Sequence, residues 1–159
     1  MTISTRLNTY LEEHQIAYQA IPHFHSHSSI GTAVTSNIPL SQIAKAVLLK
    51  DHEGRNIMAV LPANNKISLS ALNEELRASY QLVKENEVYN LFADCEHGAV
   101  PPVAEAYNMP MVCDTTLDSL DNVYIEAGDH ETLLRLDRQN FENMMATGRH
   151  IHFSKEVFH

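Results

Sequence analysis

The spacing of apolar residues predicts alternating helices and strands in the first half of the chain. Leu7, Tyr10 and Leu11 recur at helical spacing, which predicts an amphipathic helix over residues 3–14. The loop 51–55 is short and contains a glycine, so the apolar runs on either side of it read as a hairpin. The predicted elements after the first helix are a strand over 17–21, short helical pieces over 30–37 and 40–44, hairpin strands over 45–50 and 56–63, and a helix over 68–76.

The second half continues with short elements of both kinds. Asp137 is placed to cap a last helix whose inward face carries Phe141, Met144 and Met145. The other predicted elements are a helix over 85–92, a strand over 109–114, a helix opened by a capping box from Thr115 to Asp118, and a hairpin of 122–128 and 132–136 around the turn 129–131. Strands in hairpins between short helices favour a mixed α/β (α+β) sheet over a doubly wound fold.

The length and composition limit the broad class of protein. A chain of 159 residues with 44% hydrophobic and 19% charged residues suits one globular domain, which we assign to residues 1–159. The aliphatic runs are too short to cross a bilayer, and the first residues lack the apolar segment of a signal peptide. With only Cys95 and Cys113, a disulfide framework is not expected, so we predict a cytoplasmic protein without a membrane partner.

The net charge of −9 is unevenly distributed. Residues 1–79 carry equal numbers of acidic and basic side chains, whereas residues 80–159 contain the whole acidic excess. Such a chain repels a long polyanion, so we do not expect DNA binding or non-specific nucleic-acid binding. Contact with one end of a nucleic acid remains open, and its candidate cations are Lys45, Lys50, Arg55 and Lys66.

The stretch "DCEHGAVPPV" (94–103) contains candidate metal ligands. Asp94, Cys95, Glu96 and His97 are consecutive, so their side chains cannot all converge on one ion without severe distortion of the backbone. The segment "HFHSH" places His23, His25 and His27 at alternate positions, which would share one face of a strand. Surface histidines in a polar loop explain this second pattern equally well.

A cysteine nucleophile is the second interpretation of the same stretch. Cys95 would need a base, for which His97 and His130 are candidates, together with a group that orients that base. The alternative is that Cys95 and Cys113 are small buried apolar residues, which is the usual environment of a free cysteine.

A third interpretation assigns the chemistry to the backbone. Pro101 and Pro102 fix their own φ angles, while Gly98 permits a positive φ or the close approach of a ligand. The amides of Gly98, Ala99 and Val100 could then face outward in a rigid array that binds a carbonyl or oxyanion. A rigid turn without a function is the alternative.

Lys45 opens the apolar strand "KAVLLK", where strand alternation puts it on the same face as Val47 and Leu49. A buried ammonium is rare unless an anion pairs with it, so this position indicates a binding role. Lys50, at the other end of the strand, is better explained as a lysine that reaches water.

Taken together, these segments resemble the YbaK and prolyl-tRNA synthetase editing-domain family over roughly residues 15–145. The segments that carry the resemblance are "QIAKAVLLKDHEG", "MAVLPANNKISLSAL", "DCEHGAVPPV", "MVCDTTL" and "IEAGDHETLLRL". Lys45 at the start of the central strand and the Gly-x-x-x-Pro loop from Gly98 to Pro102 are the most specific elements. His130 occupies a position where several alanine-editing members carry a histidine.

The resemblance implies a curved, largely antiparallel mixed sheet with peripheral helices. It also implies hydrolysis of the ester that links a small, wrongly attached amino acid to the end of a tRNA, with alanine on proline tRNA as the first choice. No metal or organic cofactor is implied, and the partners are aminoacyl-tRNA and, as a second candidate, a tRNA synthetase.

From this resemblance we expect Lys45, Gly98, Ala99 and His130 to act in catalysis, with His130 lining the amino-acid pocket. The residues expected to contact substrate are Val100, Pro101, Pro102 and, because of its charge alone, Lys50. Two other functions stay open: a non-catalytic module that binds aminoacyl-tRNA or a synthetase, and a metal-dependent hydrolase built on the histidine-rich and 94–97 segments.

Overall fold

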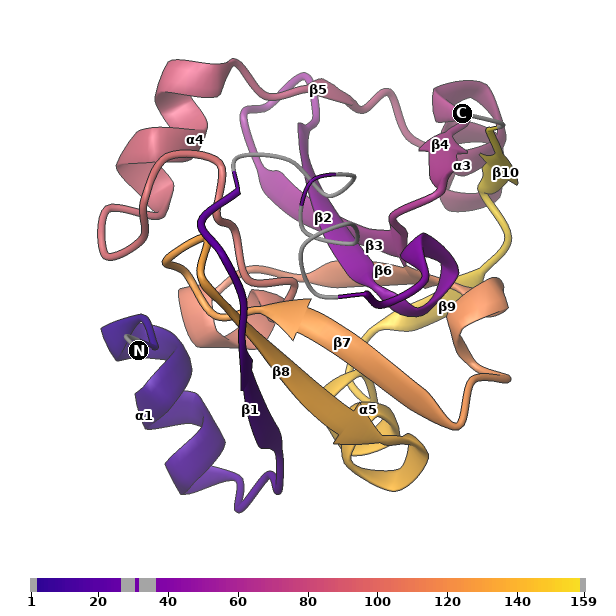
Figure 1. The fold of residues 1–159 in the computed structure, drawn as a ribbon. Coiled ribbons are helices and arrows are strands. Elements are labelled where there is room, and N and C mark those ends of the chain that lie inside the picture. The colour runs from indigo at the N-terminus through magenta and orange to yellow at the C-terminus, as the bar shows by residue number, and fades with distance from the viewer. Residues whose placement is uncertain (1–2, 27–30, 32–36, 158–159) are drawn as a thin grey trace.

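The computed structural model describes residues 3–26, 31 and 37–157, and it has a mixed α/β fold (Figure 1). The strands are β1 (Gln19–Pro22), β2 (Ala44–Lys50), β3 (Asn56–Pro62), β4 (Asn65–Ile67), β5 (Gln81–Leu82), β6 (Met111–Asp114), β7 (Asn122–Glu126), β8 (Thr132–Asp137), β9 (Arg149–Ile151) and β10 (Ser154–Glu156). The α-helices are α1 (Thr5–Glu13), α3 (Leu69–Leu76), α4 (Glu85–Leu91) and α5 (Arg138–Met144). Three short 3-10 helices are η1 (Leu40–Gln42), η2 (Ala104–Tyr107) and η3 (Thr115–Leu117).

The strands form three sheets, most of whose pairs are antiparallel. A five-stranded sheet has the order β5-β2-β3-β6-β9, and only its β3–β6 and β6–β9 pairs are parallel. The order β1-β8-β7 makes a second, antiparallel sheet, and β10 pairs with β4 in a two-stranded ribbon. The mixed fold and both predicted hairpins, β2–β3 and β7–β8, are confirmed.

Strand β2 lies between two groups of buried side chains. Ala44 and Leu48 belong to the larger core, whereas Val47 and Leu49 pack into a second core with Leu72 of α3. This alternation confirms that neighbouring residues of β2 face opposite sides of the sheet. Because both faces are buried, the strand reads in the sequence as a nearly continuous apolar run.

The predicted helices occur close to the expected positions. Helix α1 begins after Ser4, whose side chain accepts a hydrogen bond from Leu7 N, and α5 is capped by Asp137 as predicted. Phe141, Met144 and Met145 are buried, which confirms the predicted inward face. The expected helical piece over 30–37 lies mostly outside the described residues.

The N-cap predicted at Thr115 is wrong. Asp114, one residue earlier, caps η3 by accepting a hydrogen bond from Thr116 N. The other oxygen of the same carboxylate accepts from Phe153 N and Ser154 Oγ, which a threonine hydroxyl could not do at the same time. The short strands β4, β5, β9 and β10 were not predicted. Within the described residues, no helix is long and apolar enough to cross a membrane.

Asp114 is fully buried and joins three parts of the chain: β6, η3 and the segment that leads into β10. Burial alone would raise the pKa of its carboxyl group, but hydrogen bonds from Thr116, Phe153 and Ser154 outweigh that effect and lower the pKa. The ionised carboxylate therefore stabilises the packing of the C-terminal segment against β6.

Asp114→Asn should lower the free energy of unfolding at neutral pH by about 1–3 kcal/mol, because the exchange leaves buried donors without a charged acceptor. A carboxylate whose pKa is depressed in the folded state stabilises the fold above its unfolded pKa of about 4, and this stabilisation disappears as the pH falls through the folded pKa. Urea unfolding should therefore show that the difference in unfolding free energy between wild type and variant becomes smaller from neutral to acidic pH. An exposed substitution, Glu142→Gln, is the control, and a gap that stays constant down to strongly acidic pH would contradict this role.

Candidate active site

The loop after α4 contains a tight turn at residues 96–99. Ala99 N donates to Glu96 O at 2.9 Å, and Gly98 within this turn has a φ of +84°. A positive φ of this size is favourable for glycine and strained for β-branched residues, so the glycine is required by the backbone itself. Glu96 N in turn donates to Gly128 O at 2.9 Å, which attaches the loop to the β7–β8 turn.

Two carboxylates brace the β7–β8 turn: Asp129 accepts from Glu131 N and Thr132 Oγ1, each at 2.9 Å, and Glu126 accepts from the amides before them. Glu126 Oε1 accepts hydrogen bonds from the backbone amides of Gly128, Asp129 and His130 at 3.0, 3.3 and 3.1 Å. Burial raises the pKa of Glu126, and the amide donors oppose that shift. The three bonds hold His130 at a φ of +59°, an uncommon conformation for a residue other than glycine.

The loop and the turn bring Gly98 and His130 together. His130 Nε2 lies 2.7 Å from His97 O, and since a carbonyl only accepts, Nε2 is the nitrogen that donates. A Cβ added to Gly98 would lie 3.7 Å from both Cε1 and Nε2 of His130, which is ordinary van der Waals contact. The His130 ring is buried, with the edge of the His25 ring 5.5 Å away between centroids.

Lys45 reaches the same region along a neighbouring strand. Ile43 and Tyr124 form a parallel bridge, so β2 and β7 leave this point in the same direction. Lys45 and Glu126 each lie two residues beyond the bridge. The backbone of Lys45 is therefore at the same end of its strand as Glu126 and the turn that Glu126 holds. The ammonium is half-buried and lies 3.5 Å from Ala63 O, and desolvation lowers its pKa. No hydrogen bond among the described residues joins Lys45 to Gly98 or His130.

Lys50 is not brought together with Lys45. Strand alternation directs the two side chains to opposite faces of β2, and five residues of extended strand separate them by roughly 16 Å. Lys50 Nζ instead forms an ion pair with Glu87 of α4, at 2.9 and 3.0 Å from its two carboxylate oxygens. The two lysines cannot hold the same small group.

The expected array of three outward amides is reduced to two. Ala99 is fully buried and its N–H is already bonded to Glu96 O, so it forms part of the turn. Gly98 is exposed and Val100 half-buried, and no hydrogen bond within the described part of the chain occupies their amides. Pro101 and Pro102 are buried behind them.

The side chains of Asp94, Cys95, Glu96 and His97 do not converge on one point: the first two lie together at Tyr107, and the other two contact His25 and Tyr89. Asp94 accepts from Arg6 N at 2.9 Å and from the Tyr107 hydroxyl at 3.0 Å. Glu96 lies 2.9 Å from His25 Nε2, and the pKa of His25 is raised chiefly by its hydrogen bond to Glu96. The remaining pair contact aromatic residues: the Cys95 thiol lies 3.3 Å from the Tyr107 hydroxyl, and the His97 ring stacks on the Tyr89 ring with centroids 3.8 Å apart.

Burial raises the pKa of Cys95 to about 11, so its thiolate is scarce at neutral pH, and this disfavours a nucleophilic role. Of the alternating histidines, His23 and His25 are described and His27 lies outside the described residues. Within the described ranges, the one group of three potential ligands that converge is Cys113, Asp118 and His150, whose ligand atoms lie within 4.8 Å of one another. It involves none of the ligands considered from the sequence.

Glu126 is the residue of this site that sequence reasoning missed. The signal was present in the segment "EAGDH", where a carboxylate at the end of a strand precedes a turn containing glycine. Such a side chain can accept from the backbone amides of the turn that follows it. Glu126 positions His130 through a left-handed backbone conformation at His130. Sequence alone does not predict that conformation for a histidine.

Three comparisons with known proteins bear on this geometry. The family model of the aminoacyl-tRNA editing domain matches residues 25–143. In a comparison with curated proteins, no relative matches the chain. A solved structure of the hypothetical protein APE2540 has a TM-score of 0.83 and 20% identity, covering 94% of this chain and 99% of that chain. A candidate trans-editing enzyme for prolyl tRNA synthetase has a TM-score of 0.80 and 18% identity, covering 97% of each chain.

At these identities the two solved structures establish the fold alone, whereas the family model extends over most of the sequence, including Lys45, the turn at Gly98 and His130. The chain belongs to the aminoacyl-tRNA editing domain family.

Proposed function

We propose that this protein is a deacylase that acts in trans on a mischarged tRNA and removes a small amino acid, with alanine on proline tRNA as the first substrate to test. The observation that supports this most is the hydrogen bond from His130 Nε2 to His97 O, which places the ring beside Gly98, in two loops near the strand that carries Lys45. The family match supplies the class of reaction.

In the proposed mechanism, water attacks the carbonyl carbon of the ester, and the bond to the terminal ribose oxygen then breaks. The ribose oxygen leaves with one proton of the water, and the free amino acid departs as its carboxylate while the second proton passes to solvent. The amides of Gly98 and Val100 donate to the carbonyl oxygen as it gains negative charge, which is where fixed donors accelerate acyl transfer most. Buried Pro101 and Pro102 keep these amides in place.

Lys45 holds the phosphate of the terminal nucleotide or the ester oxygens. Its half-buried ammonium is under-solvated, so an anion that reaches it gains more than it would from a fully hydrated lysine. His130, fixed by Glu126 and His97, forms one wall of the amino-acid pocket. A hydroxyl of the substrate ribose is the proposed aid to proton transfer.

The proposed partners are the acceptor end of aminoacyl-tRNA and, as a second candidate, a tRNA synthetase. A cytoplasmic location agrees with this role because charged tRNA is used there. The chain needs no organic cofactor or metal for the mechanism proposed here.

A panel of tRNAs carrying alanine, serine, threonine, cysteine or the correct amino acid would test the function. Under single-turnover conditions, a small misacylated amino acid should be released faster than in buffer, with the same rate after treatment of the protein with a chelator. Binding of charged tRNA without release of any amino acid would identify a binding module instead. Loss of release after chelation would identify a metal-dependent hydrolase.

Lys45→Ala should lower the single-turnover rate by two to three orders of magnitude, because a cation near developing charge typically contributes a few kcal/mol. Lys45→Arg should recover little of the lost activity, since a planar guanidinium does not replace a compact ammonium. Circular dichroism should report a folded protein in both cases. A near-normal rate for Lys45→Ala would remove this lysine from the mechanism.

Gly98→Val should abolish most of the activity, because a β-branched residue is strained at a φ of +84° and its side chain would project toward the His130 ring. Cys95→Ala, only three residues away, should stay within about tenfold of wild type, a change of at most about 1.4 kcal/mol in the barrier. Both rates are measured in single turnover on proteins with matching circular dichroism spectra. An inactive Cys95→Ala protein beside an active Gly98→Val protein would replace the backbone mechanism with one that uses the thiol.

A further inference from the structure

Two lysines face each other across the two-stranded ribbon of β4 and β10. Lys66 and Lys155 are partners in the antiparallel register, so their side chains leave the same face of the ribbon. Directly opposed residues have Cβ atoms roughly 4.5–5.5 Å apart, and like charges at this distance repel each other. Both side chains are exposed, and within the described part of the chain neither forms an ion pair.

This arrangement places two positive charges side by side in a protein with a net charge of −9. Lys50, Arg55 and Arg138 each have a carboxylate partner within 3.2 Å, whereas Lys66 and Lys155, like the other described lysines and arginines, have none. An anion placed between the two ammonium groups would offset the repulsion between these opposed lysines. A phosphodiester fits this requirement, because it has one negative charge and two free oxygens.

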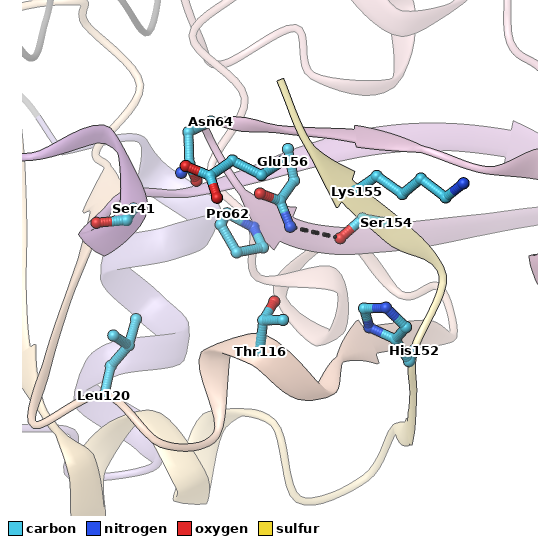
Figure 2. Close-up of a pocket in the computed structure, with 10 residues that line it drawn as sticks. Ser41, Pro62, Asn64, Thr116, Leu120, His152, Ser154, Lys155 and Glu156 are labelled. Atoms are coloured by element: carbon cyan, nitrogen blue, oxygen red, sulfur yellow. Dashed lines mark hydrogen bonds between the residues drawn. The ribbon is translucent and has the colours of Figure 1, made fainter. Parts of the chain in front are cut away.

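A cavity of about 410 Å³, to which several polar residues contribute, adjoins the ribbon (Figure 2). Its lining includes Asn64, Thr116, His152, Lys155 and Glu156. In Figure 2 the side chains of Asn64 and Glu156 point toward each other at one side of the cavity, while Lys155 extends in the opposite direction.

Asn64 Oδ1 is buried and has no hydrogen-bond partner, which is costly for an acceptor. This oxygen and the neighbouring Glu156 carboxylate are both acceptors, so a group bound at this side of the cavity needs a donor. A hydroxyl group of a sugar meets this requirement, whereas a second phosphate would be repelled by Glu156.

The cavity lies next to the residue that Lys45 contacts. Ala63, whose carbonyl oxygen is 3.5 Å from Lys45 Nζ, stands between Pro62 and Asn64 of the cavity lining. Lys66 follows Ala63 by three residues, so their Cα atoms are at most roughly 10 Å apart. A strand of nucleic acid that ends beside Lys45 would therefore pass the ribbon within a few nucleotides of its end.

We propose that the β4–β10 ribbon and this cavity bind adjacent nucleotides of the RNA strand that leads to the ester bond. The Lys66–Lys155 pair binds a phosphodiester, and Asn64 Oδ1 accepts a hydrogen bond from a neighbouring ribose 2′-hydroxyl, the group that distinguishes RNA from DNA. The inference rests on the proposed function for the identity of the RNA. It adds Lys155, from the acidic half of the chain, to the expected contact surface.

The test measures fluorescence anisotropy of a labelled, uncharged RNA hairpin with a single-stranded 3′ end, titrated with protein at several salt concentrations. The Lys66→Gln/Lys155→Gln double variant should raise Kd about tenfold at low salt and reduce the slope of log Kd against log salt by about 0.7–0.9, the loss of one phosphate contact. Lys84→Gln is the control for a single charge: Lys84 is exposed and precedes α4, which lies far from β10 in Figure 1, so Kd should change less than twofold.

A second arm replaces single 2′-hydroxyls near the 3′ end of the RNA with hydrogen. One such replacement should weaken binding to wild type severalfold but leave binding to Asn64→Ala unchanged, because that variant has already lost the acceptor. Equal affinity of wild type and the double variant, or no RNA binding by wild type at low salt, would overturn the proposal. So would equal effects of 2′-deoxy substitution on wild type and Asn64→Ala.

Because the RNA carries no amino acid, these measurements do not depend on hydrolysis. If the protein binds RNA through the ribbon but releases no amino acid from any charged tRNA, this inference stands and the proposed function is wrong. If the protein hydrolyses the ester and binds RNA with no contribution from the lysine pair, the proposed function stands and this inference is wrong.

Discussion

The carboxylate of Glu126 is the constraint on which the candidate site depends. By accepting from three successive amides it holds the β7–β8 turn in a left-handed conformation that His130 would rarely adopt alone. That conformation directs the His130 ring toward His97 O and Gly98. The Glu96–Gly128 hydrogen bond then attaches the second loop to the first, so neither can shift without the other. The site is thus built from two loops, one held by the Glu126 carboxylate and the other attached to it through Gly128 O.

The regular elements of the fold were largely predictable because each depends on local chemistry. Glycine in the 51–55 loop and the apolar runs beside it specified the β2–β3 hairpin, and Asp137 specified the start of α5. The missed strands β4, β9 and β10 have only three residues each, too few for a period-two pattern to appear. They exist because of pairing with distant partners: β10 with β4, and β9 with β6. Asp114, which supports that pairing, resembles any other turn aspartate in the sequence.

In the candidate site too, some residues were predictable from the sequence and others were not. Resemblance to a family gave Lys45, Gly98 and His130, and the structure places the last two side by side. The availability of a backbone amide depends on tertiary structure, which is why Ala99 was expected to face outward when its N–H closes a turn. Lys50 was included because of its charge, and its ion pair with Glu87 of α4 was not visible at a separation of 37 residues. Sequence patterns find residue types, whereas partners that are distant in sequence require the fold.

The central claim is that Lys45, the Gly98 turn and His130 line one pocket for an aminoacyl group at the end of an RNA. The most direct test is a nuclear magnetic resonance titration of the ¹⁵N-labelled protein with alanyl-adenosine in which a stable amide replaces the ester. The account predicts that the largest shifts fall on the amides of Gly98 and Val100 and on residues around Lys45 and Glu126. Largest shifts at the separate cavity formed by α1 and η2, or no shifts at saturating analogue, would contradict it.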